Sequence, residues 1–184
     1  MSVFITVGLG LDDPAASPHI DSAGVLVVGP HQLLNWLESQ LALELPSASF
    51  TERMLQYLAC LKGAKPEQRF YNNSMLLDEI GVARRLLQWR DKWYEAGWYG
   101  QPFESVNQRL ADMADIEQLA KSSVALNSGQ RVQRVLSALE NCPLNIQMTT
   151  IDPINLYSTI LQKLLRRFEA KEIVPHEYSR AAKG

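Results

Sequence analysis

The residues that could do chemistry in this sequence are few and far apart. His19, His31 and His176 are widely separated along the chain, and none has a Cys, Asp or Glu neighbour at the spacing of a metal site. Cys60 and Cys142 show neither metal spacing nor the framework of a disulfide-bonded domain. No serine or cysteine lies in a nucleophile elbow. The sequence therefore predicts no catalytic residue, no metal site and no cofactor.

Two glycine-containing turns are candidates for binding an anion. The stretch 8–10, GLG, follows the first apolar run, but the Lys and Ser or Thr of a phosphate-binding P-loop do not follow it. We therefore expect neither hydrolysis nor tight binding of ATP. The stretch 29–32, GPHQ, opens a predicted helix, and the N–H groups at a helix N-terminus attract phosphate. Gly29, His31 and Gln32 are therefore predicted contacts to a nucleic-acid phosphate, with an ordinary strand-to-helix turn as the alternative.

Basic residues form two local clusters in a chain whose formal net charge is only −2. The first cluster, on the outer face of a predicted helix, is Arg84, Arg85 and Lys92. The second cluster, near the end of the chain, is Lys163, Arg166, Arg167 and Lys171. Three of its members recur at i, i+4 and i+8, the spacing of one helix face, and a basic stripe can follow a phosphate backbone. The second cluster is therefore predicted to contact DNA, and a solvated face balanced by nearby acidic residues is the alternative.

The stretch 81–100 carries three of the four tryptophans and predicts the central helix. One apolar row follows the i, i+4, i+7, i+11 spacing of a helix face and consists of Val82, Leu86, Trp89 and Trp93. A second row, Ala83, Leu87 and Tyr94, runs beside it. Gly97 is predicted to end the helix as a left-handed cap. We expect Trp89 and Trp93 to be largely buried, because each is a large apolar side chain.

Strands and helices can be placed around this central helix. The predicted strands are Val3–Val7, Gly24–Val28, Leu144–Met148 and a short last one at Glu172–Pro175. The predicted helices cover His31–Leu43, a stretch from Ser49 or Thr51 to Gly63, a short one at Phe70–Leu77 with Ser74 as a cap for the central helix, Asn107–Lys121, Gln130–Glu140 and a last one from Asp152-Pro153 onward. Residues 8–22 are expected as an irregular loop.

This order of elements predicts an α/β fold. We expect a small, mostly parallel sheet with helices on both faces and a helical insertion over about residues 51–140. Residues 1–178 would form a single domain, and residues 179–184 a polar tail. With 46% hydrophobic residues and no apolar run of membrane-spanning length, a soluble, cytoplasmic protein is expected, with no membrane partner.

Several stretches together resemble one protein family. The segments 25–43 (VLVVGPHQLLNWLESQLAL), 69–98 (ending in ARRLLQWRDKWYEAGW), 109–117 (RLADMADIE) and 131–170 are similar to the N-terminal region of bacterial AddB/RecC-like proteins of the PD-(D/E)XK nuclease family. The resemblance covers almost the whole chain and is most specific in the WRD…AGW stretch. It implies a degenerate RecA-like domain, similar to the first domain of superfamily 1 helicases. It also implies either a fragment of a longer polypeptide or a stand-alone version of its first domain.

The resemblance implies no catalytic residue within this chain, because the family's nuclease motif belongs to a C-terminal domain. It implies a non-catalytic domain for DNA contact and scaffolding in DNA repair or defence, with further domains of a longer polypeptide or a helicase subunit as partners. The alternative is a protein-interaction module without DNA binding. Because Trp and Arg are enriched at binding hot spots, its predicted interface residues are Arg84, Arg85, Trp89, Arg90 and Trp93. An enzyme acting at the edge of the α/β sheet is the third hypothesis.

Overall fold

The computed structural model describes residues 3–12, 19–20, 24–44, 48–102 and 107–173. The chain divides into two compact units, which we call the sheet unit (residues 1–45 and 131–184) and the helical unit (residues 46–130). The helical unit corresponds to the helical insertion predicted over about residues 51–140. The division falls within one helix, α6 (Ser128–Asn141).

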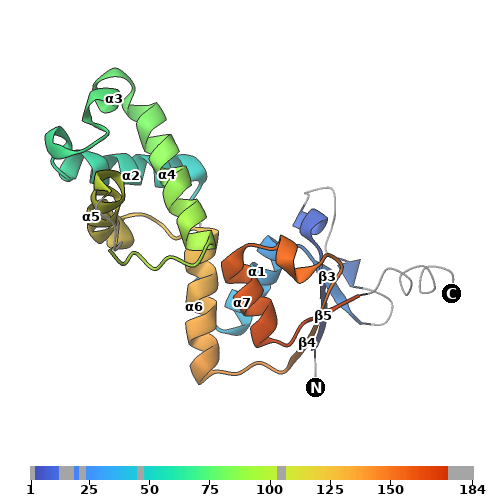
Figure 1. Ribbon diagram of the computed structural model, residues 1–184. Helices are drawn as coiled ribbons and strands as arrows, with labels where there is room; N and C mark the ends of the chain where they lie inside the picture. Colours follow the sequence, from blue (N-terminus) through green and yellow to red (C-terminus); the bar gives the residue numbers. More distant parts are fainter. Residues whose placement is uncertain (1–2, 13–18, 21–23, 45–47, 103–106, 174–184) are drawn as a thin grey trace. The chain divides into compact units, whose positions relative to one another are not determined.

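The sheet unit contains a mostly parallel sheet, as predicted (Figure 1). Its strand order is β2 (His19–Ile20), β3 (Leu26–Val28), β1 (Val3–Val7), β4 (Ile146–Thr150) and β5 (Lys171–Glu172). Strands β3, β1, β4 and β5 run parallel, and β2 pairs antiparallel with β3. The α/β class is therefore confirmed. Strand β2 and a short 3-10 helix, η1 (Leu9–Asp12), lie in the stretch 8–22 that was expected to be irregular.

The core of the sheet unit lies on one face of the sheet. Ile5 pairs with Leu26 and Met148, so these side chains share that face. Helices α1 (Pro30–Gln40), α6 and α7 (Thr159–Arg167) pack there through buried leucines, isoleucine and valines, among them Leu33, Leu37, Val135, Leu139 and Leu164. On the opposite face Phe4 is 45% exposed. Among the described residues the helices of this unit therefore cover one face, whereas helices on both faces were expected.

Helix α7 begins later than predicted, at Thr159 rather than near Asp152. A 3-10 turn, η3 (Ile154–Leu156), comes first, and Tyr157 after it has an extended backbone that interrupts the helical path. The hydroxyl of Tyr157 donates to the carbonyl of Val7 at 3.1 Å, which fixes this segment to the end of β1. The chain after Arg167 also leaves the helix, because Glu169 adopts a positive φ of 51°.

The helical unit is built from four helices and the first residues of α6. They are α2 (Phe50–Gly63), α3 (Asn72–Leu77), α4 (Glu79–Glu95) and α5 (Gln108–Ser123), with a 3-10 turn η2 (Pro66–Gln68) between α2 and α3. Ser49 and Glu52 form the capping box of α2. The N-cap of α4 is Asp78, whose carboxylate accepts from the Gly81 N–H at 2.8 Å, and not the predicted Ser74.

Helix α4 ends as predicted at Gly97. The N–H groups of Gly97 and Trp98 donate to the carbonyls of Tyr94 and Trp93, and Gly97 has a φ of 97°, which together make a Schellman cap. The second apolar row, Ala83, Leu87 and Tyr94, is buried, while Trp89 and Trp93 are partly buried at the edge of the core rather than enclosed by it.

Candidate functional site

The predicted anion site at the start of α1 is filled by a side chain of the protein itself. The Asp12 carboxylate accepts from the His31 N–H at 3.0 and 2.9 Å and from the Gln32 N–H at 3.2 Å. A Cβ atom at Gly29 would lie 2.2 Å from Asp12 Oδ1, so glycine is required for this approach. A phosphate would meet both occupied N–H groups and a like charge. The prediction that Gly29, His31 and Gln32 contact DNA is therefore corrected.

A second carboxylate has the same role after β1. Asp152 Oδ2 accepts from the Leu9 N–H at 2.7 Å, so an N–H of the glycine-containing turn after β1 is also paired. The carboxyl ends of parallel strands are where α/β folds commonly bind ligands. At the carboxyl ends of β1 and β3, carboxylates of this protein already accept hydrogen bonds from backbone N–H groups. The backbone N–H groups at this edge of the sheet are therefore used for hydrogen bonds within the protein.

The second basic cluster does not form one helical stripe. Lys163, Arg166 and Arg167 are exposed on α7, but Lys171 lies in β5, where it pairs with Thr149. The helix ends before Lys171, so the expected i, i+8 neighbour of Lys163 is lost. The four side chains stay exposed within the sheet unit, and their contact with DNA stays a prediction.

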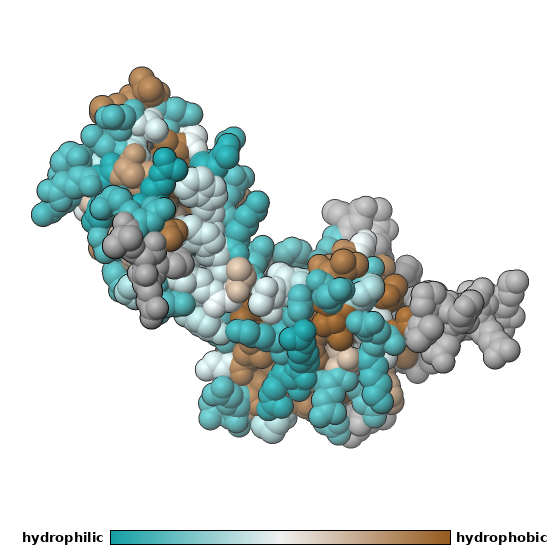
Figure 2. Space-filling model, viewed as in Figure 1, coloured by the Kyte–Doolittle hydropathy of each residue, from teal (hydrophilic) through white to brown (hydrophobic). Residues whose placement is uncertain are grey.

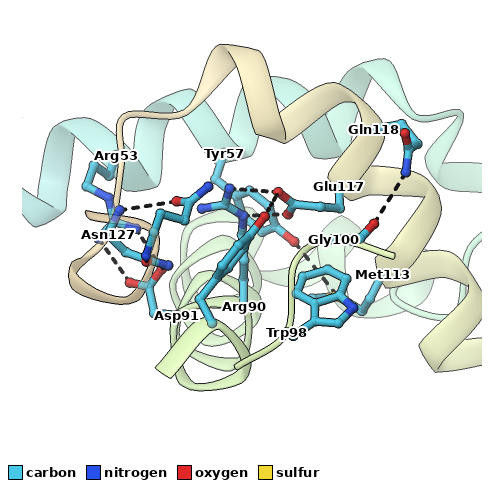
Figure 3. A network of polar contacts seen from close by, with 12 residues as sticks. Arg53, Tyr57, Arg90, Asp91, Trp98, Gly100, Met113, Glu117, Gln118 and Asn127 are labelled. Carbon is cyan, nitrogen blue, oxygen red and sulfur yellow. Dashed lines mark hydrogen bonds and ion pairs between the residues drawn. The ribbon is translucent and has the colours of Figure 1, made fainter. Parts of the chain in front are cut away.

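The largest correction concerns Arg90, which was predicted at an interface. Arg90 is fully buried, and its Nε and Nη2 atoms donate to the Glu117 carboxylate at 2.6 and 2.8 Å (Figure 3). The Tyr94 hydroxyl donates to the same carboxylate at 2.8 Å. Arg90 therefore connects α4 to α5 within the folded unit and is not available to a partner.

The surroundings of Arg90 and Tyr94 keep both side chains protonated. Burial by itself lowers the pKa of Arg90, but the hydrogen bonds and the charge of Glu117 outweigh burial and leave the pKa above its ordinary value. Burial, followed by the hydrogen bond to Glu117, raises the pKa of Tyr94. The guanidinium and the phenol thus both remain protonated at neutral pH and fix the register of α4 against α5.

Two further ion pairs hold α4 and α5 to their neighbours. Arg53 of α2 donates to both oxygens of Asp91 at 2.9 and 2.6 Å, and the Asn127 amide donates to Asp91 at 2.9 Å (Figure 3). Near the start of α5, the buried Asp112 accepts from Arg69 Nη1 at 3.0 Å and from the Phe70 N–H at 2.9 Å. The segment before α3 and the body of α4 are therefore fixed in place by α5 and α2.

These contacts position an open groove on the helical unit, which we call the α3–α4 groove. It has a volume of about 650 Å³, and we define it by Phe70, Leu77, Val82, Arg85, Trp89 and Arg109. Leu77 is 90% exposed and its neighbour Leu76 is 79% exposed. Figure 2 shows apolar side chains gathered over α3. Exposed large apolar side chains beside a groove indicate a binding surface, since single exposed ones need no explanation but clusters do.

Some of the predicted interface residues line the groove, and the others do not. Arg85 and Trp89 line it, whereas Arg84 is exposed but does not line it, and Arg90 is buried. Trp93 packs edge-to-face against Trp98, with ring centroids 5.6 Å apart. Sequence reasoning missed Phe70, Leu77 and Arg109. A signal was present for Leu77, because three consecutive apolar residues, Met75 to Leu77, in a short helix cannot all face one core.

The described residues contain no cluster of three or more His, Cys, Asp or Glu side chains able to hold a metal ion. Among those same residues, none of the helices combines the length and apolar character of a membrane span. Comparison with known proteins adds no assignment: no family profile matches the sequence, and no curated protein matches it. The resemblance to AddB/RecC-like proteins thus stays a prediction.

Proposed function

We propose that this chain is a non-catalytic scaffolding domain that binds a protein partner in the α3–α4 groove. The observation that carries the proposal is the exposure of Leu77, at 90%, beside a groove whose walls are held by buried ion pairs. A groove that is rigid before binding loses little conformational entropy when a partner enters. A partner that covers Leu77 and Trp89 would remove apolar surface from water, which is the main driving force of association.

The proposal retains the biological setting that the resemblance implies. In an AddB/RecC-like protein, such a domain would serve DNA repair or defence, and the partner would be a further domain of a longer polypeptide or a helicase subunit. The α/β sheet unit is compatible with a degenerate helicase-like domain. The groove supports the scaffolding part of this role more directly than it supports DNA contact, because its lining is mainly apolar and aromatic.

Binding of amphipathic helical peptides to the purified chain tests the proposal. A panel of fluorescently labelled three-turn peptides with leucines on one face, in acidic, neutral and basic versions, would be titrated by anisotropy. We expect at least one version to bind, and the Leu77→Asp variant to bind it at least about tenfold more weakly because a carboxylate replaces an apolar contact. Leu55→Asp is the matched control, since Leu55 is 52% exposed on α2 and does not line the groove.

The result that would contradict the proposal is equally clear. If no peptide binds, or if Leu77→Asp and Leu55→Asp reduce binding equally, the groove is not the binding surface. Circular dichroism of both variants checks that each is folded. Because both side chains are exposed, neither replacement should change the fold.

A second candidate function, contact with single-stranded DNA, is favoured by one observation. Lys163, Arg166, Arg167 and Lys171 are all exposed in the sheet unit, two of them in the last turn of α7. Neighbouring acidic residues, Glu169 and Glu172, are exposed as well and reduce the local positive potential. We therefore rank DNA contact below protein binding.

A further inference from the structure

We infer that the α3–α4 groove selects an amphipathic helix that carries carboxylates beside its apolar face; this inference rests on the function proposed above and specifies the partner. Four features of the groove support it: the shape of its walls, their length, the charges on its rim and the identity of the cationic side chains.

The walls have the geometry of a helix-binding groove. On α4, the lining residues Val82, Leu86 and Trp89 recur at i, i+4 and i+7, so they form one continuous apolar row. Phe70 and Leu77, which lie outside α4, also line the groove. Along α4 the lining extends from Asp78 to Trp89, which is roughly 16 Å at the rise of an α-helix. That length accepts about three turns of a partner helix, whose apolar anchors would recur at the same spacing.

The charges on the rim are predominantly positive and unpaired. Arg85 and Arg109 line the groove, and no carboxylate of a described residue forms an ion pair with either. Arg109 lies over the Phe70 ring, with 5.7 Å from its guanidinium carbon to the ring centroid. The one acidic residue of the lining, Asp78, already accepts from the Gly81 N–H as the cap of α4. Two guanidinium groups therefore face an incoming ligand.

The identity of these cations favours carboxylates. Guanidinium groups bind carboxylates with two parallel hydrogen bonds, which adds orientation to attraction. The contact of Arg109 with the Phe70 ring holds its guanidinium beside the groove, which both residues line. Phosphate would satisfy the same cations, but a nucleic-acid strand would leave Leu77 and Val82 in contact with a charged backbone. An acidic amphipathic helix satisfies both parts of the groove.

The experiment uses two designed three-turn peptides as probes, with the same leucine row. One carries glutamate at the flanking positions, and the other carries lysine at each of those positions. For the wild-type chain, we expect the glutamate peptide to bind at least about fivefold more tightly than the lysine peptide, and the difference to shrink as salt increases. Anisotropy with each labelled peptide gives both affinities in one buffer series.

A charge exchange on the protein identifies the residue responsible. Arg85→Glu should weaken the glutamate peptide about fivefold and strengthen the lysine peptide, whereas Arg84→Glu should change both much less. Arg84 is a matched control because it is the adjacent residue of α4, is also exposed, and does not line the groove. A merely structural effect of Arg85→Glu would weaken both peptides together, and that result would overturn the inference.

The remaining outcomes separate this inference from the function on which it rests. Equal binding of the two peptides, or equal effects of Arg84→Glu and Arg85→Glu, would overturn the acidic partner while leaving the groove as a binding surface. Absence of binding by either peptide would overturn both. Self-association of the wild-type chain in sedimentation that Arg85→Glu abolishes would overturn the inference in favour of a second copy as the occupant.

Discussion

The two units place their charged side chains in different ways. In the sheet unit, Asp12 and Asp152 pair with backbone N–H groups at the carboxyl end of the sheet, and the buried Glu38 of α1 accepts from Arg131 and Arg134 of α6. In the helical unit, Arg90, Arg53 and Arg69 each join two segments through a carboxylate, while apolar side chains over α3 remain exposed.

The difference is that the sheet unit pairs carboxylates with backbone N–H groups at the end of its sheet, whereas the helical unit leaves large apolar side chains exposed beside the α3–α4 groove. In the sheet unit, the N–H groups of Leu9 and His31 at the carboxyl end of the sheet are paired with Asp152 and Asp12. In the helical unit the strong ion pairs lie inside, and the surface that they position is apolar with a cationic rim. Removing an ion pair from the helical unit, titrating its tyrosines and removing a carboxylate from the sheet unit each test this difference.

The largest expected effect comes from Glu117→Gln. This change leaves the buried Arg90 guanidinium without its counter-charge, and loss of one member of a buried pair costs about 3 to 5 kcal/mol. Urea unfolding followed by tryptophan fluorescence measures it, because three of the four tryptophans lie in the helical unit. Asp115→Asn is the control: Asp115 also pairs with an arginine, Arg69, but its side chain is 62% exposed.

A loss below about 1 kcal/mol for Glu117→Gln, similar to that of a surface pair, would show that Arg90 and Glu117 do not hold the helical unit together. The double replacement Arg90→Met with Glu117→Leu sharpens the result. It should recover much of the stability, because apolar side chains of similar size often replace a buried ion pair without loss.

Alkaline pH should destabilise the helical unit more steeply than the sheet unit. Burial raises the pKa of Tyr71 from 10 to about 12, and burial also raises the pKa of Tyr57 and Tyr94. Among the described residues of the sheet unit, Tyr157 is the one such phenol, and burial raises its pKa to about 12. Above pH 10 the unfolded chain releases phenolic protons that the folded chain keeps, so stability is full below pH 10 and falls as pH rises toward 12.

Between its unfolded and folded pKa values, each such phenol contributes a slope of at most about 1.4 kcal/mol per pH unit. Unfolding free energies measured at several alkaline pH values, together with tyrosinate absorbance, report it. Tyr71→Phe should make the decline shallower by one phenol. A pH dependence identical to wild type in this variant would mean that Tyr71 ionises normally in the folded chain.

A smaller effect is expected from Asp12→Ala in the sheet unit. The change removes the carboxylate that caps α1, and loss of a helix cap costs about 1 kcal/mol. Thermal unfolding of the variant measures this loss of stability, and Asp12→Asn should lose less stability because its amide oxygen still accepts hydrogen bonds from the backbone.

If the start of α1 has any capacity for phosphate, Asp12→Ala should strengthen binding of single-stranded DNA. Unchanged DNA binding with unchanged stability would show that the Asp12 contacts are weak in solution.

How far the sequence predicts this structure depends on the range of the contacts involved. The strands at β1 and β3 follow from local runs of β-branched residues, and the Gly97 cap follows from one glycine after a helix. The parallel order follows from the alternation of strands and helices along the chain. The cap of α4 was not predictable, because Ser74 and Asp78 are both good capping residues and the end of α3 at Leu77 decides between them.

The features of the candidate site depend on residues far apart in sequence. The ion-pair partner of Arg90 is Glu117, which lies on another helix, α5. From the sequence of α4 alone, the charged Arg90 was therefore predicted at the surface, whereas α5 buries it in the structure. Asp12 contacts the start of α1 although the strands β2 and β3 lie between them in the sequence. The groove needs Phe70 and Arg109 beside α4, and no periodicity within α4 indicates that arrangement.

The smallest effect on stability, and the sharpest test of the second candidate function, comes from three cations of the sheet unit. If Lys163, Arg167 and Lys171 contact single-stranded DNA, replacing all three by Ala should reduce the slope of log affinity against log salt by up to about 2, at about 0.7 per phosphate. Binding by the wild type is expected only at low salt, since a net charge of −2 gives no long-range attraction. Anisotropy across a salt series measures both slopes.

The matched control replaces three exposed cations of the helical unit, Arg84, Lys92 and Lys121, by Ala, which changes the net charge equally. An equal reduction in both triple variants would mean that only overall charge matters. No binding by the wild type even at low salt would contradict DNA contact by this chain.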